Sequence, residues 1–135
     1  MIKLYTQTSC HSSLAARQWL RTHEIEFEEK NFSLDLPTVT ELKHILSLTE
    51  NGLDDIISKR SKYYSEVAEY LPKMQLNDAL ELLCLRPKLL RRPIIVSTNK
   101  LQIGFNAEDI RQFIPRTIRR MNFDGMLKNY TWGEM

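Results

Sequence analysis

The spacing of apolar positions predicts a strand, a helix and a second strand at the start of the chain. Residues 2–6 are short, apolar and rich in β-formers, so we expect a first strand. Ile25 and Phe27 alternate with glutamates and predict the second strand. Between them, apolar side chains recur at the i, i+3, i+4 and i+7 spacing of one helix face. These positions are Ala16, Trp19, Leu20 and His23.

The middle third of the chain has helical spacing only. Thr38, followed three residues later by Glu41, forms the capping box typical of a helix start. Gly52 is expected to end that helix, because glycine adopts the left-handed conformation such an end often needs. A further helix is expected to begin at Ser61. The last helix of this region has one apolar face, formed by Leu76, Ala79, Leu80 and Leu83.

Strand patterns return after this helical region. The apolar runs at 93–97 and 101–104 are joined by a short link and predict an antiparallel hairpin. Pro93 lies just before the first run, where thioredoxin-like folds place a cis-proline facing the redox turn, although the sequence also permits a trans bond. Asn106 is expected to cap a last helix that ends at Pro115.

The predicted order is β-α-β, several helices, then β-β-α, which indicates an α/β protein. We expect a thioredoxin-like mixed sheet interrupted by a helical subdomain, within a single domain of residues 1–135. The thioredoxin-like part comprises 1–32 and 91–116, and the inserted helical subdomain comprises 33–90. Residues 121–135 are expected to form a loose tail.

The composition indicates the class of protein and its cellular compartment. The 135 residues are 42% hydrophobic and 27% charged, a globular balance. No apolar run approaches the roughly 20 residues of a membrane span, and the start of the chain has no signal-peptide pattern. Two cysteines do not make a secreted disulfide framework. We therefore expect a cytoplasmic protein with no membrane partner, and the sequence indicates neither a metal site nor a cofactor.

The net charge of +2 is unevenly distributed. Residues 86–120 contain nine Lys or Arg and only two acids. Such a dense basic segment favours an anionic partner, namely a phosphate, a nucleic acid or an acidic protein surface. The alternative is a solvated basic face balanced by the glutamates of residues 24–29.

Cys10 lies between the first predicted strand and helix. The free N–H groups and the dipole of a helix start favour a thiolate there. Thioredoxin-like and glutaredoxin-like folds place a Cys-x-x-Cys motif at this point, but here the second position is Ser13, which cannot resolve a mixed disulfide. The alternative is that Cys10 is merely a small residue in a turn. Cys84, one turn after Leu80, is expected to be a core residue.

Several strings spread over residues 1–120 form a distinctive combination. They are Leu4-Tyr5-Thr6 with Ser9-Cys10, Ala16-Arg17-x-Trp19-Leu20, Thr49-Glu50-x-Gly52, Ile56-Ile57-Ser58-x-Arg60-Ser61-Lys62, Leu89-Leu90-Arg91-Arg92-Pro93-Ile94-Ile95 and Arg111-x-Phe113-x-Pro115-Arg116. Together they resemble the Spx family of RNA-polymerase-binding transcriptional regulators. The wider group that the chain resembles is the arsenate reductase-like superfamily.

The resemblance implies a regulator and not an enzyme. Spx proteins bind the C-terminal domain of the RNA polymerase α subunit and alter promoter use in the stress response. Gly52 matches the glycine of that contact, and Arg60, Lys62, Arg91 and Arg92 match basic positions linked to regulation or to anion binding. Contact with promoter DNA is expected to be weak or indirect, because the basic segment lacks a recognisable reading helix.

Two departures from the family pattern matter. The redox switch of the family is a Cys-x-x-Cys disulfide, and Ser13 makes this chain a Cys-x-x-Ser paralogue that cannot form it. Such a regulator is either fixed in one state or senses oxidants through the single thiol of Cys10. Family members also present a small apolar tail to the ClpXP protease, which makes ClpXP a further expected partner. Residues 131–135 do not match that tail.

An oxidoreductase is the alternative reading. In an arsenate reductase-like or monothiol glutaredoxin-like enzyme, Cys10 would attack the substrate while Arg60 and Arg92 neutralise an oxyanion. Against this, Thr8 stands where the reductases carry a proline. A third possibility is a paralogue that competes for the polymerase without sensing anything.

Overall fold

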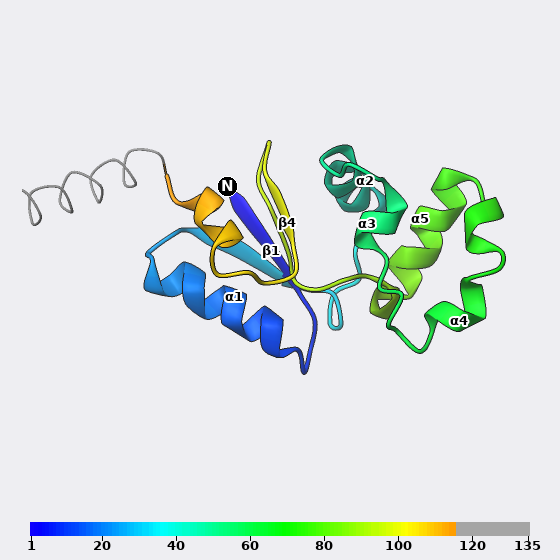
Figure 1. Cartoon of the computed structure of the whole chain (residues 1–135), viewed down its shortest axis with the longest axis horizontal. Coiled ribbons are helices and arrows are strands. Elements are labelled where there is room, and N and C mark those ends of the chain that lie inside the picture. Colours follow the sequence, from blue (N-terminus) through cyan, green and yellow to red (C-terminus); the bar gives the residue numbers. More distant parts are fainter. Residues whose placement is uncertain (116–135) are drawn as a thin grey trace, which may run out of the picture.

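A computed structural model describes residues 1–115 and shows a four-stranded mixed sheet (Figure 1). The strand order is β2-β1-β3-β4. Strand β1 pairs parallel with β2 and antiparallel with β3, and β3 pairs antiparallel with β4. The βαβ unit and the hairpin predicted from the sequence are therefore confirmed. The strands are β1 Ile2–Thr6, β2 Phe27–Asn31, β3 Ile94–Val96 and β4 Leu101–Ile103.

One face of the sheet is covered by α1, residues His11–Thr22, and by a 3₁₀ helix η3, residues Asp109–Phe113. Leu4 of β1 and Ile95 of β3 point to this face, as the period of two along a strand requires. Ile25 also belongs to this core, although it precedes β2 and was expected within the strand. Its backbone N–H donates to the carbonyl of Leu20, so the end of α1 holds Ile25 outside the ladder.

The last element differs from the predicted α-helix. The N-cap residue is Glu108 and not Asn106, which lies in the preceding turn. There the Asn106 Oδ1 accepts from the backbone N–H groups of Glu108 and Asp109. The helix that follows is a short 3₁₀ helix, however. The nearby Pro115 leaves little room for α-helical turns, and short segments of this kind commonly close as 3₁₀ helices. The expected tail at residues 121–135 lies outside the described residues.

The other face of the sheet packs against a group of helices between β2 and β3 (Figure 1). Tyr5, Ile94 and Val96 of the sheet share a core with these helices, because they alternate with the residues that face α1. Helices α2 and α5 supply Leu42, Ile45 and Leu80, among others, to this core. The helices are α2 Val39–Ser47, α3 Leu53–Ile56, α4 Tyr64–Val67 and α5 Leu76–Leu85, with 3₁₀ turns η1 Leu71–Lys73 and η2 Pro87–Leu89.

Local signals in this helical region have mixed outcomes. The Thr38–Glu41 capping box is present in full. The helix expected from Ser61 is only the four-residue α4, and the Ser61 hydroxyl accepts a hydrogen bond from the N–H of Tyr63 before it starts. Leu76, assigned to the buried face of α5, is 50% exposed because it lies in the first turn, beyond the core.

Two further features concern the peptide bond before Pro93 and the character of the helices. The Arg92–Pro93 peptide bond is cis, which decides between the cis and trans forms that the sequence left open. None of the helices within residues 1–115 has both the length and the apolar character needed to cross a membrane.

Candidate functional site

Cys10 forms the N-cap position of α1, with extended backbone angles. Its carbonyl accepts the first helical hydrogen bond from Leu14, and its thiol is free and half-buried. The preceding Ser9 has φ of 59°, which is uncommon for a residue with a side chain. A hollow of about 440 Å³ opens at this turn. It is lined by Gln7, Thr8, Ser9, Cys10, His11, Ser13, Leu14, Arg17 and Asn31.

Ser13 occupies the position of the missing second cysteine. It is 1% exposed, and its Oγ accepts a hydrogen bond of 3.4 Å from the backbone N–H of Gln7. The serine thus ties the first turn of α1 to the end of β1. Cys10 and Cys84 are both free in the structure.

Arg17, the cation that lines the Cys10 hollow, is paired with a carboxylate. Its Nε and Nη2 donate to the two oxygens of Glu29, each at 2.6 Å. The Thr6 hydroxyl donates to the same carboxylate at 2.9 Å. The hydrogen bond from Arg17 holds the pKa of Glu29 below its ordinary value, against the opposing effect of partial burial. Arg17 therefore already has an anionic partner within the protein.

We expect Glu29→Gln to weaken the acid dependence of stability. A carboxyl group with a lowered pKa in the folded state stabilises the protein above its unfolded pKa, and this contribution is lost as pH falls through the folded pKa. The variant should be about 1 kcal/mol less stable at pH 7 and should lose less stability than wild type below about pH 4.5. Urea unfolding across this pH range measures both effects.

Glu26→Gln is the matched control. Glu26 is an exposed glutamate just before β2, and within residues 1–115 it makes no ion pair. Its replacement should leave the pH profile close to that of wild type. Equal profiles for Glu29→Gln and Glu26→Gln would contradict a stabilising role for the Arg17–Glu29 pair.

The two arginines expected to hold an oxyanion do not line the hollow at Cys10. Arg92 Nη1 donates instead to the side-chain oxygen of Gln7 at 2.6 Å, and Arg60 is exposed in the segment after α3. Within the described part of the chain, Arg60 forms no ion pair. The structure thus brings Arg92, but not Arg60, next to a residue of the Cys10 turn.

Gln7 is the residue that the sequence analysis missed. It is 4% exposed, and its amide has two partners far along the chain. Its oxygen accepts from Arg92, and its nitrogen donates to the carbonyl of Pro87 at 2.7 Å. A polar side chain directly after an apolar strand was the available signal, because a buried amide requires hydrogen-bond partners. Gln7 therefore links the Cys10 turn to the segment that precedes β3.

Gly52 lies at the start of α3, and not at the end of α2 as expected. Its backbone angles, φ 67° and ψ −133°, are accessible essentially to glycine alone. Its N–H donates to the Thr49 hydroxyl. The Asp55 carboxylate accepts hydrogen bonds from the backbone of Asn51 and Glu50, which hold the pKa of Asp55 below its ordinary value. This turn is therefore fixed by its own side chains.

Arg91 and the sheet edge lie beside the Gly52 turn. The Arg91 N–H donates to the carbonyl of Ile56 at 2.8 Å, and its Nη1 lies 3.5 Å from the carbonyl of Asp55. A hollow of about 260 Å³ separates these groups from strand β4. We call this surface the Gly52 surface; besides Gly52 it comprises Leu48, Thr49, Glu50, Asp55, Arg91, Leu101 and Ile103.

The remaining predicted residues lie apart from both hollows. Lys62 is exposed before α4, with its Nζ 5.4 Å from the ring centroid of Tyr63. Cys84 packs partly buried against the core, and burial raises the pKa of its thiol. Residues 1–115 contain no group of three or more His, Cys, Asp or Glu placed to hold a metal ion.

Comparison with known proteins identifies the family. The ArsC family model matches residues 5–113, and the chain belongs to the ArsC family. Within it, the chain belongs with the Spx proteins. It is 46% identical over 121 residues to the "Global transcriptional regulator Spx" of Enterococcus faecalis, covering 90% of this chain and 92% of that protein. It is 44% identical to the Bacillus subtilis regulator of the same name, covering 88% and 91%.

Solved structures agree on the fold. An ArsC family related protein from Bacteroides fragilis superposes with a TM-score of 0.71 at 25% identity, covering 83% of this chain and 96% of the other. An arsenate reductase from Vibrio cholerae gives 0.70 at 20% identity, covering 84% and 94%. The predicted thioredoxin-like, arsenate reductase-like fold is confirmed.

Proposed function

We propose that this chain is a transcriptional regulator that binds the C-terminal domain of the RNA polymerase α subunit through the Gly52 surface. Through that contact it alters promoter use in the stress response. The observation that carries the proposal is the Gly52 turn, whose backbone angles require glycine and which lies beside Arg91 and the edge strand β4. A Cβ at Gly52 would meet no other atom within 4 Å, so the backbone is open to a partner.

The charges of the Gly52 surface favour a polar protein contact. Arg91 and the carboxylates of Glu50 and Asp55 lie together around a hollow with Leu101 and Ile103 of β4. Such a mixture of an apolar centre and flanking charges is typical of protein interfaces. The α-subunit domain is the partner that the resemblance to the Spx family implies.

The arrangement at Cys10 supports a role other than catalysis. Neither Arg60 nor Arg92 lines its hollow, and the cation that does, Arg17, is bound by Glu29. Among residues 1–115, no Arg or Lys that lines this hollow is free of a carboxylate partner and available to neutralise an oxyanion substrate. We infer that this chain is a regulator and not an arsenate reductase or monothiol oxidoreductase.

We also propose that binding is independent of an internal disulfide, because Ser13 stands at the second position of the motif. Wild type should bind the isolated α C-terminal domain with equal affinity before and after treatment with a thiol oxidant, as measured by isothermal titration calorimetry. Ser13→Cys should restore a Cys-x-x-Cys pair at a helix N-terminus, whose thiols oxidise readily. Its affinity should then differ at least about threefold between reduced and oxidised samples.

Ser13→Ala and Ser13→Cys/Cys10→Ala are the controls, because each has only one of the two thiols of the pair. Their affinities should not depend on the oxidant. Absence of wild-type binding under both conditions would overturn the proposed function. A wild-type affinity that changes on oxidation would instead overturn only the redox independence, and intact-mass analysis would then identify the modified form of Cys10.

A further inference from the structure

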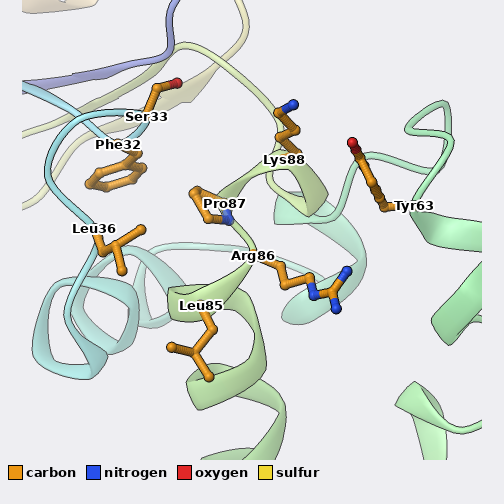
Figure 2. Close-up of a pocket in the computed structure, with 8 residues that line it drawn as sticks. All are labelled: Phe32, Ser33, Leu36, Tyr63, Leu85, Arg86, Pro87 and Lys88. Atoms are coloured by element: carbon orange, nitrogen blue, oxygen red, sulfur yellow. The ribbon is translucent and has the colours of Figure 1, made fainter.

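The surface has a third hollow, besides those at Cys10 and at the Gly52 turn. It has a volume of about 340 Å³ and is formed where the loop after β2 meets the end of α5 and the turn η2 (Figure 2). We call it the Leu85 groove. It is lined by Phe32, Ser33, Leu36, Tyr63, Leu85, Arg86, Pro87 and Lys88. It shares no lining residue with the Gly52 surface or the Cys10 hollow.

Two of its leucines are strongly exposed. Leu85 is 72% exposed at the last position of α5, and Leu36 is 49% exposed in the loop after β2. Single exposed leucines are ordinary on protein surfaces. Here both border one hollow together with Phe32 and Pro87, as Figure 2 shows. An apolar side chain placed in the groove would remove these leucines from water, which is favourable at roughly 25 cal/mol per Å².

The charged side chains of the groove are all positive. Arg86 and Lys88 line it, and no Asp or Glu of residues 1–115 does. The ion pair of Arg86 with Glu66 spans 3.8 Å between side chains that are 55% and 62% exposed, a geometry of little energetic value. Lys88 makes no ion pair within residues 1–115, and its Nζ lies 5.4 Å from the ring centroid of Tyr63.

A third cation adds to this charge. The Nζ of Lys62 also lies 5.4 Å from the ring centroid of Tyr63. The ammonium groups of Lys62 and Lys88 therefore both lie near one aromatic ring at the border of the groove. Neither lysine has a carboxylate partner in the described part of the chain. Cations held close together repel each other, and an anionic ligand relieves that repulsion. The charge complement of this groove is therefore a carboxylate-rich ligand.

The inner wall of the groove is preformed. Phe32 is 1% exposed and stacks on Tyr5 of β1 with ring centroids 4.7 Å apart. The carbonyl of Pro87 is held by the amide of Gln7. A wall fixed in this way loses little conformational freedom when a ligand binds, which favours affinity.

We propose that the Leu85 groove docks a short acidic segment of a partner protein, with a leucine or similar apolar side chain between its carboxylates. The apolar side chain packs against Leu36 and Leu85. The carboxylates pair with Arg86 and Lys88. The volume suits one or two side chains and not a whole folded surface. This site lies apart from the proposed contact with the α-subunit domain and does not depend on it.

Two labelled peptides test the proposal on the full chain. In the first, leucine alternates with aspartate, and in the second, lysine replaces every aspartate. Fluorescence polarisation should show saturable binding of the acidic peptide, with affinity at least about tenfold higher than for the basic one. Two-dimensional NMR of the ¹⁵N-labelled chain should place the largest shift changes at the groove residues.

Matched variants separate the contribution of charge to peptide binding from that of apolar contact. Lys88→Glu should weaken binding of the acidic peptide about tenfold or more, and Leu85→Gln about threefold or more. The controls are Lys73→Glu and Leu76→Gln, which change an exposed lysine and an exposed leucine outside the groove. Both should bind within about twofold of wild type.

Four results would overturn the proposal. They are equal affinity for the two peptides, no saturable binding of either, shift changes centred outside the groove, and equal losses in the variants and their controls. Other occupants have their own signatures in the free chain. Groove shifts that vary with chain concentration identify a second copy, and NOE contacts from the groove to residues 116–135 identify the chain's own C-terminal segment.

Discussion

Gly52→Arg is expected to reduce affinity for the α C-terminal domain at least about tenfold, which corresponds to roughly 1.4 kcal/mol. Two effects act together. The backbone angles of Gly52 are unfavourable for any residue with a Cβ, so the turn must shift or carry strain of about 1–3 kcal/mol. The new guanidinium would also extend from the turn that we propose to contact the partner, near the like charge of Arg91. Calorimetric titration measures the loss.

Two controls separate this loss from a folding defect. Gly52→Ala carries the same backbone strain without the long cation, so it should lose a similar stability but less affinity. Gln18→Arg adds the same charge to an exposed position of α1, which packs on the opposite face of the sheet from the helical region. Its affinity should equal that of wild type. A folded Gly52→Arg protein that binds as tightly as wild type would rule out the Gly52 surface as the contact.

Leu80→Ala is expected to destabilise the fold by about 2–5 kcal/mol. Leu80 is fully buried on α5, in the core that α5 shares with α2 and the sheet. Truncation leaves a cavity that these neighbours fill only partly, and domains of this size are stable by only about 5–15 kcal/mol in total. Guanidinium unfolding followed by circular dichroism measures the difference.

Leu76→Ala is the matched control, because it makes the same substitution on the same helix. Leu76 is 50% exposed, so the cost should stay below about 0.5 kcal/mol. A similar cost at both positions would show that burial of Leu80 in the shared core adds no stability beyond that of an exposed leucine on α5. The helical group between β2 and β3 would then not depend on its shared core with the sheet.

The sequence predicted correctly those features that depend on residues close together along the chain. The strands follow from alternation, since Leu4 and Ile95 face one core while Tyr5 and Ile94 face the other. The capping box at Thr38 formed as predicted, because both partners lie within one turn. Where several weak signals competed, prediction was less accurate: Gly52 begins α3, and the last helix is a 3₁₀ helix.

Side chains that meet across long stretches of chain were beyond the reach of spacing arguments. Gln7 bonds Pro87 and Arg92, which lie 80 and 85 residues further along. The Arg17–Glu29 pair depends on the crossover of the βαβ unit, and it decides whether Arg17 is available to a substrate. Hydrogen-bond partners of this kind are set by three-dimensional packing, which a residue pattern does not encode.

The sequence by itself determined that this chain has a thioredoxin-like sheet with a helical region between its strands, a single thiol at the Cys10 turn, and family motifs centred on Gly52 and Arg91. Periodicity and motifs depend on residues that are neighbours in the sequence, so they can be recognised without a structure. Tertiary structure alone decided which charges are already paired, which residues line each hollow, and that Leu36, Leu85 and Lys88 border one groove. Those properties arise because folding brings separate segments within contact distance.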